Sequence, residues 1–168
     1  GRDDCTIARL ARGEFDARLG EFARWLRSLG PRPVLLRVGY EFDGPWNNYD
    51  PQQFRAGWKY LHRFLREAAV DNVAFVYHSH GFASYETLEA YWPSADADNE
   101  RYVDWIGYSY FQMDPDIVGR EERRFARDRG LKVFLGEVAP HTGDCSRQID
   151  LAKDTALGQR WMANFFRH

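Results

Sequence analysis

The sequence predicts an α/β protein in which parallel strands alternate with helices. Short apolar segments recur at intervals of roughly 30 to 40 residues, and segments with helical spacing of their apolar residues lie between them. Such alternation is typical of a parallel sheet covered by helices. The chain has 168 residues, enough for one ordinary domain with a sizeable core, and no linker or low-complexity tract divides it. We therefore treat residues 1–168 as a single domain.

The first predicted helix is followed by a strand. Apolar residues recur at helical spacing over residues 15–26, and Gly30-Pro31 ends this run. The next segment, PVLLRVGYE (33–41), is short and apolar at its start, which predicts a buried strand ending at Glu41. Because alternate residues of a strand face the same side, Arg37 and Glu41 are expected on one face.

A second helix is predicted to begin at Asp50. Asp50 is the expected N-cap, Pro51 occupies the first turn, and Gln53 is placed to reach back to the cap. The remaining elements alternate in the same way: a strand at 72–80, a short helix at 85–92, a strand at 103–111, a helix at 117–130, a strand at 131–140 and a helix at 151–166.

The bulk composition argues against several classes of partner. The net charge is −2 and charged residues make up 29%, so neither nucleic acid nor an anionic membrane is an expected partner. No apolar run approaches the roughly 20 residues of a membrane helix. Aromatic residues reach 16%, which suits both a core and a groove that stacks sugar rings. Cys5 and Cys145 form one disulfide or remain two thiols.

Four strands leave two architectures open. A complete eight-stranded (β/α)8 barrel needs about 250 residues, so the chain is either a small doubly wound open sheet or half to two-thirds of a barrel. In both architectures functional groups collect at the carboxyl ends of the strands. Two of the predicted strands end in a glutamate, Glu41 and Glu137, and others end in His78, His80, Ser109 and Tyr110.

Two strand-end glutamates indicate glycoside hydrolysis. An isolated carboxylate at a buried strand end is unfavourable, so each glutamate is either paired with an arginine such as Arg37 or functional. Two carboxyl groups that face one cleft can protonate a leaving oxygen and attack an anomeric carbon. A guanidinium at Arg37 would keep a nearby carboxylate ionised. Trp46 and Tyr49, just past the strand, would form a wall that stacks on sugars.

Three blocks of sequence resemble the glycoside hydrolases of family 26. These blocks are RVGYEFDGPWN (37–47), YVDWIGYSYF (102–111) and KVFLGEVAP (132–140). The resemblance implies a (β/α)8 barrel of the retaining clan, with catalytic glutamates on strands four and seven. It implies that Glu41 is the acid/base, that Glu137 is the nucleophile and that Arg37 is the inward arginine of strand four. The activities of that family are mainly endo-β-mannanase, with some β-1,3-xylanase and mixed-linkage glucanase.

The chain departs from the mannanase pattern at several places. Tyr40 stands where a histidine often precedes the acid/base, and Ser109 and Phe111 stand where an aspartate and a tyrosine often occur. These departures argue against mannan specificity more than against the reaction type. By the same alignment the chain holds about strands four to seven, so it is an incomplete catalytic domain. Its open sheet edges would expose backbone groups and favour self-association.

The resulting prediction is a retaining endo-glycoside hydrolase that acts on a β-glycan, either β-mannan, β-1,3-xylan or mixed-linkage β-glucan. No cofactor is expected, and no metal, because His78 and His80 alone do not make a ligand set. The alternative is a non-catalytic carbohydrate-binding or scaffold fragment of such a barrel. Secretion is expected from the size of the polysaccharide partner, although no signal-peptide pattern is present. The predicted substrate-binding residues are Arg37, Tyr40, Trp46, Tyr49, His78, Ser109 and Tyr110.

Overall fold

The computed structural model describes residues 6–93, 101–111, 116–140 and 155–167. Helices and strands alternate in the predicted order, with one additional short helix at the start. The helices are α1 (Thr6–Ala11), α2 (Asp16–Ser28), α3 (Pro51–Glu67), α4 (Tyr85–Tyr91), α5 (Arg120–Asp128) and α6 (Thr155–Phe165). The strands are β1 (Val34–Arg37), β2 (Val73–Ser79), β3 (Trp105–Tyr110) and β4 (Lys132–Val138).

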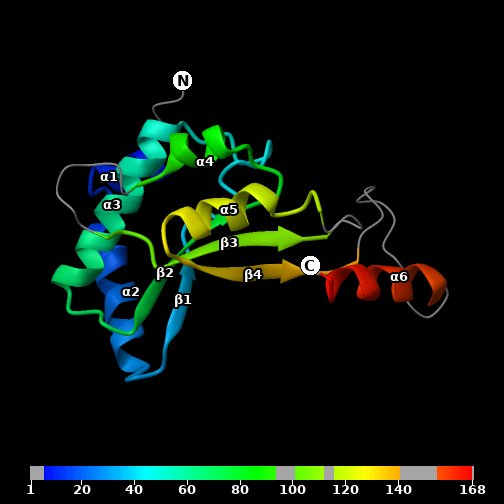
Figure 1. The fold of residues 1–168 in the computed structure, drawn as a ribbon. Coiled ribbons are helices and arrows are strands. Elements are labelled where there is room, and N and C mark those ends of the chain that lie inside the picture. The colour runs from blue at the N-terminus through cyan, green and yellow to red at the C-terminus, as the bar shows by residue number, and fades with distance from the viewer. Residues whose placement is uncertain (1–5, 94–100, 112–115, 141–154, 168) are drawn as a thin grey trace.

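The four strands form one parallel sheet in the order β1-β2-β3-β4. Helices α1 to α5 lie to one side of the sheet, and α6 lies beyond the end of β4 (Figure 1). A doubly wound sheet would reverse its strand order at a switch point and carry helices on both faces. Consecutive strand order with helices on one side is instead the arrangement of a (β/α)8 barrel. The prediction of a partial barrel is confirmed, and the doubly wound alternative is wrong.

The core lies between the sheet and its helices. Phe75 and Tyr77 of β2 point to the helix side, where their rings pack against Trp58 of α3 and Phe125 of α5. All four side chains are fully buried. The opposite face of the same strand carries His78, and this alternation is what separates the core from the functional face.

The outer strands are more exposed than the inner ones. β1 and β4 form the two edges of the sheet, and Leu35, Val133 and Val138 on them are 42%, 37% and 41% exposed. The segment that contains β1 was expected to be a buried strand, because apolar runs are typical of strands with neighbours on both sides. This prediction is wrong for β1, because among the described residues it pairs with β2 alone. β2 and β3, in the middle, are buried as expected.

The predicted start of α3 is confirmed in part. Asp50 accepts a hydrogen bond from the backbone nitrogen of Gln53 at 3.0 Å, and Pro51 follows the cap. The side-chain oxygen of Gln53 is buried and makes no hydrogen bond within the described part of the chain, so the predicted bond from Gln53 back to the cap is wrong.

Cys5 and Cys145 lie outside the described residues, so their pairing stays a prediction. Within the described ranges, no helix has the length and apolar character needed to cross a membrane.

Candidate active site

Polar side chains gather on the face of the sheet opposite the helices, at the carboxyl ends of the strands. We call this the inner face. It carries Arg37 from β1, His78 from β2, Ser109 from β3 and Glu137 from β4. Glu41, from the loop after β1, joins them. The structure therefore brings together both predicted catalytic glutamates and three of the predicted substrate-binding residues.

The five side chains form one continuous series of hydrogen bonds. Ser109 donates from its hydroxyl to Glu41 Oε1 at 2.6 Å. His78 Nε2 lies 3.2 Å from Ser109 Oγ, and His78 Nδ1 lies 3.2 Å from Arg37 NH1. Arg37 NH1 also donates to Glu137 Oε1 at 2.9 Å. Glu41 and Glu137 are thus the two ends of one hydrogen-bonded series that crosses all four strands.

Arg37 fixes where the protons of this series lie. A guanidinium only donates, so His78 Nδ1 must be the acceptor and carries no hydrogen. The hydrogen of a neutral His78 ring is then on Nε2, which donates to Ser109 Oγ. Burial, reinforced by the positive charge of Arg37, lowers the pKa of His78 to about 4. The ring is therefore neutral at ordinary pH, and every hydrogen bond runs outward from Arg37 toward the two glutamates.

Glu41 reaches the inner face from a turn rather than from the end of a strand. β1 ends at Arg37, and residues 38–41 form turns in which Gly39 and Glu41 have φ of 49° and 54°. The backbone nitrogen of Glu41 donates to the carbonyl of His78 at 2.7 Å, and Asn47 Nδ2 donates to the Glu41 carbonyl at 2.7 Å. The prediction of a strand through residue 41 is wrong, but the expected proximity of Arg37 and Glu41 on one face is retained.

Glu137 is directed to the inner face by a β-bulge. Tyr108 pairs with Leu135 and Ser109 pairs with Glu137, so Gly136 is the extra residue of β4. Without this insertion Glu137 would lie opposite Tyr110 and face the helices. A Cβ on Gly136 would lie 2.5 Å from His78 Cε1 and 3.2 Å from Arg37 NH1. Glycine is therefore required here, because the ring of His78 and the guanidinium of Arg37 occupy the adjacent space.

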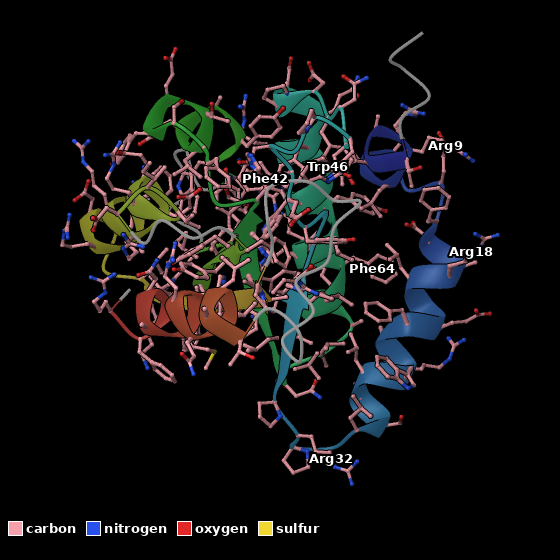
Figure 2. The ribbon with its side chains drawn as sticks, turned by 90° about the vertical axis from the view of Figure 1, so that its right-hand side faces the viewer. Arg9, Arg18, Arg32, Phe42, Trp46 and Phe64 are labelled. Atoms are coloured by element: carbon pink, nitrogen blue, oxygen red, sulfur yellow. The ribbon has the colours of Figure 1, made fainter. Side chains whose placement is uncertain are left out.

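Two of the predicted aromatic contacts lie open beside the glutamates. Tyr40 is 48% exposed, and the Arg37 guanidinium lies 5.1 Å from the centre of its ring. Trp46 is 62% exposed, and its ring meets that of His80 edge-on at 5.9 Å. Figure 2 shows Trp46 and Phe42 at the end of the sheet opposite Arg32, which precedes β1. Both exposed rings are thus available at the carboxyl end of the strands.

Two predicted substrate-binding residues do not belong to this site. Tyr110 is fully buried and packs against Trp161 of α6, because it faces the helix side while Ser109 faces inward. Tyr49 is half-buried, packs against Phe54 of α3, and lines a groove with α1 and α2 rather than the inner face. The structure therefore does not bring either residue to the inner face.

A second polar cluster, which the sequence analysis did not identify, lies beside Glu41. Asp43 accepts hydrogen bonds from the backbone nitrogen of His80 at 2.9 Å, from His80 Nδ1 at 2.7 Å and from Ser79 Oγ at 2.8 Å. Ser79 Oγ also lies 2.6 Å from Glu122 Oε1 of α5. The sequence analysis named His80 as a strand-end residue, but Asp43 lies in a turn, so its spacing from Glu41 gave no signal for the pairing.

Charge in this cluster is distributed unevenly. Burial alone would lower the pKa of His80, but its hydrogen bond to Asp43 and the negative charge there raise it above the ordinary value. Burial would likewise raise the pKa of Asp43, but His80 holds it below the ordinary value. Burial raises the pKa of Glu122, and the nearby Asp43 charge adds to this. The cluster is therefore an Asp43–His80 ion pair next to a carboxyl group that favours its neutral form.

Comparison with known proteins supports a glycoside hydrolase relationship. No protein-family model matches the chain. The chain is 28% identical over 180 residues to the β-1,3-xylanase TXYA of a Vibrio species, an alignment that covers 96% of this chain and 37% of that protein. It is also 28% identical to a β-1,3-xylanase of an Alcaligenes species, with 96% of this chain and 36% of that protein covered. The chain therefore spans little more than a third of these curated relatives.

The fold is similar to part of a protein of known structure. A GH26 β-mannanase from Bacteroides ovatus superposes with a TM-score of 0.62 and 21% identity, over 82% of this chain and 46% of that chain. In fold the chain matches part of that barrel, and in sequence it aligns along nearly its whole length with β-glycan hydrolases. The chain is thus similar in sequence to part of these β-1,3-xylanases and in fold to part of the GH26 β-mannanase barrel.

Proposed function

We propose that this chain is the catalytic part of a retaining β-glycan hydrolase in which Glu137 is the nucleophile and Glu41 is the acid/base. The observation that carries the proposal is the hydrogen-bonded series that joins these two glutamates through Ser109, His78 and Arg37. Two carboxyl groups held at one end of a sheet, on one face, match the needs of double displacement. A purely structural salt bridge would need one glutamate and one arginine, not two glutamates joined through three further side chains.

The proposed reaction has two steps. In the first, a carboxylate oxygen of Glu137 forms a bond to the anomeric carbon while the glycosidic bond breaks and Glu41 gives its proton to the leaving oxygen. In the second, Glu41 takes a proton from water, whose oxygen attacks the anomeric carbon and releases Glu137. Arg37 would orient Glu137 through its 2.9 Å hydrogen bond. No cofactor takes part in either step.

Glu41 and Glu137 have environments that suit these different roles. Glu41 is buried, at 8% exposure, and its hydrogen-bond partner Ser109 can either donate to a carboxylate or accept from a carboxylic acid. Ser109 therefore remains bonded to Glu41 in both of its protonation states. Glu137 is paired with a permanent cation, and its side chain is 35% exposed. An acid that must gain and lose a proton and a nucleophile that must stay ionised are expected to differ in this way.

Among the β-glycans, β-1,3-xylan is the substrate we favour. The two curated relatives, which align with 96% of this chain, are β-1,3-xylanases. Tyr40 replaces the histidine that often precedes the acid/base in the mannanase pattern, which argues against mannan. Tyr40 and Trp46 would stack on sugar rings, since both are exposed beside Glu41. We expect internal cleavage of the polymer and, given the size of that polymer, a secreted protein.

The test compares the chain with variants of each glutamate. Glu137→Ala is expected to lower kcat on β-1,3-xylan oligosaccharides by about 10⁴-fold or more, because the nucleophile is lost. On a dinitrophenyl β-xyloside, whose leaving group departs without a proton, Glu41→Ala should be partly rescued by azide, which attacks the glycosyl-enzyme without a general base. Proton NMR of the first product should show the β-anomer, as retention requires. Glu86→Ala, which removes an exposed glutamate of α4, is the matched control and should leave the rate unchanged.

Two outcomes would contradict the proposal. Unchanged turnover in Glu137→Ala would end its assignment as nucleophile. A wild-type chain that binds β-1,3-xylan but releases no reducing ends, while its melting curve shows a folded protein, would favour the alternative of a non-catalytic carbohydrate-binding fragment.

A further inference from the structure

The loop between β1 and α3 carries the proposed acid/base and contains no helix or strand of its own. We call residues 38–50 the Glu41 loop. Glu41 and Asn48 have φ of 54° and 49°, values at which a side chain is strained by about 1–3 kcal/mol. Such conformations persist only where surrounding contacts fix them. The contacts that hold this loop therefore determine where the Glu41 carboxyl lies.

Asp43 supplies three of these contacts, beside the 2.7 Å backbone hydrogen bond of Glu41 to His78 and the packing of Phe42 on Tyr77. Its carboxylate accepts from the backbone nitrogen of His80, from His80 Nδ1 and from the hydroxyl of Ser79, at 2.9, 2.7 and 2.8 Å. Its side chain is only 2% exposed. Bonds to a buried, ionised carboxylate are stronger than bonds between neutral groups. Asp43 thus joins the Glu41 loop to the end of β2 with three hydrogen bonds, two residues beyond Glu41.

His80 also contacts the exposed aromatic residue of the loop. The ring of Trp46 meets the ring of His80 edge-on at 5.9 Å. On its other side Trp46 lies over Gly44, where a Cβ would come within 2.5 Å of the indole. The orientation of Trp46 therefore depends on Gly44 and on His80, whose own position is fixed by Asp43. The Asp43–His80 ion pair thus holds the loop two residues beyond Glu41, and its His80 ring contacts Trp46.

We infer that Asp43 is a positioning residue, which acts with His80 to hold Glu41 and Trp46 at the carboxyl end of β2. The inference rests on the proposed role of Glu41 as acid/base. Asp43 itself touches neither of the reacting carboxyl groups. Its contribution would be geometric, since a displacement of about 1 Å in a catalytic group can lower a rate by about 10²-fold.

The chemistry of the leaving group separates this role from a general structural one. An unactivated glycoside needs a proton from Glu41 as its glycosidic bond breaks, whereas a dinitrophenolate is stable enough to leave without one. A misplaced acid/base therefore slows the first reaction and spares the second. A protein that is merely less well folded loses the same fraction of its activity on both substrates.

We therefore expect different effects of Asp43→Asn on two substrates. The value of kcat/KM on β-1,3-xylo-oligosaccharides should fall about 100-fold. On a dinitrophenyl β-xyloside, kcat/KM should change by less than about threefold, because this parameter reports the step in which the leaving group departs. His80→Leu should resemble Asp43→Asn, and His80→Asn, whose amide nitrogen can donate in place of Nδ1, should recover part of the loss. Asp71→Asn, an exposed aspartate at the other end of the sheet, is the matched control.

A measurement without substrate keeps the inference testable if the wild-type chain hydrolyses neither compound, which would count against the proposed function alone. In Asp43→Asn, hydrogen–deuterium exchange should become faster in residues 38–50 and stay unchanged in α2 and α4. Equal losses on both substrates, or exchange in residues 38–50 that matches the wild-type chain, would overturn the positioning role of Asp43.

Discussion

His78 connects the two glutamates because its two ring nitrogens face different partners. Nδ1 accepts from Arg37 and Nε2 donates to Ser109, which only a neutral ring in one tautomer can do. The ring is fully buried, and glycines on the neighbouring strand positions make room for it. A Cβ at Gly107 would lie 3.3 Å from His78 Cβ, and one at Gly136 would lie 2.5 Å from His78 Cε1. The site thus depends on residues that have no side chain.

Gly136→Ala tests this dependence. The added methyl group would displace His78 and Arg37, so we expect the free energy of unfolding to fall by about 1–3 kcal/mol. Because both side chains belong to the series that orients Glu137, kcat/KM should fall as well. Urea unfolding and oligosaccharide hydrolysis measure the two effects. Gly20→Ala in α2 is the control: its Cβ meets only Arg24 NH1, at 3.6 Å, and the change should stabilise the helix by about 0.5–1 kcal/mol. A Gly136→Ala variant as stable and active as wild type would refute the packing argument.

At the scale of elements, the order and type of the helices and strands follow from the sequence, whereas two local departures do not. The alternation of strand and helix is carried by long apolar patterns, which the structure confirms from α2 to α6. The end of β1 was predicted four residues too late, because Val38 and Tyr40 are apolar enough to extend a strand pattern although Gly39 turns the chain. The β-bulge at Gly136 depends on pairing with β3, which a single segment does not reveal.

The residues of the candidate site were likewise only partly predictable from the sequence. The sequence identifies Glu41, Glu137, Arg37, His78 and Ser109, all of which lie on the inner face. It also names Tyr110, which lies on the helix side, since adjacent residues of a strand face opposite sides and Ser109 occupies the inner one. It misses the Asp43–His80 pair, because an ion pair between two separate loops leaves no periodic pattern in the chain.

The contact between α5 and β2 leads to a prediction about pH. Glu122 is 1% exposed, and its Oε1 lies 2.6 Å from Ser79 Oγ, which is also 2.8 Å from Asp43 Oδ2. Burial raises the pKa of Glu122 in the folded chain above 4.5, its ordinary value. A group with a raised folded-state pKa stabilises the fold below its unfolded-state pKa, and this contribution is lost as the pH rises through the folded-state pKa.

Glu122→Gln removes this loss, because glutamine keeps the acceptor oxygen for Ser79 and Ala83 but does not ionise. Near pH 4 the variant and the wild-type chain should melt at similar temperatures. As the pH rises toward 8, the variant should become the more stable of the two. Thermal melts at several pH values measure this difference, in which the contributions of other titrating groups cancel. Glu121→Gln, at the neighbouring exposed position, should show no such trend; a parallel pH profile for Glu122→Gln and wild type would contradict the prediction.

At the scale of the whole molecule, the described strands leave two edges of the sheet unpaired. A (β/α)8 barrel pairs every strand with two neighbours, whereas β1 and β4 each have one among the described strands. The relative with a solved structure matches this chain over 46% of its own length, so the matched region is part of a larger barrel. Exposed edges of parallel strands present unpaired backbone groups, and those of β1 and β4 also present Leu35, Val133 and Val138.

We therefore predict that the 168-residue chain associates with itself through these edges. Light scattering coupled to gel filtration should give an apparent mass above 19.7 kDa that rises with protein concentration. Replacing Leu35 and Val133 with lysine should shift the population toward the monomer, because charged side chains on an edge strand oppose pairing with another chain. Met162→Lys, an exposed position on α6 that belongs to neither edge strand, serves as the control and should leave the mass unchanged. A chain that remains monomeric at every concentration would mean that β1 and β4 do not act as pairing edges in solution.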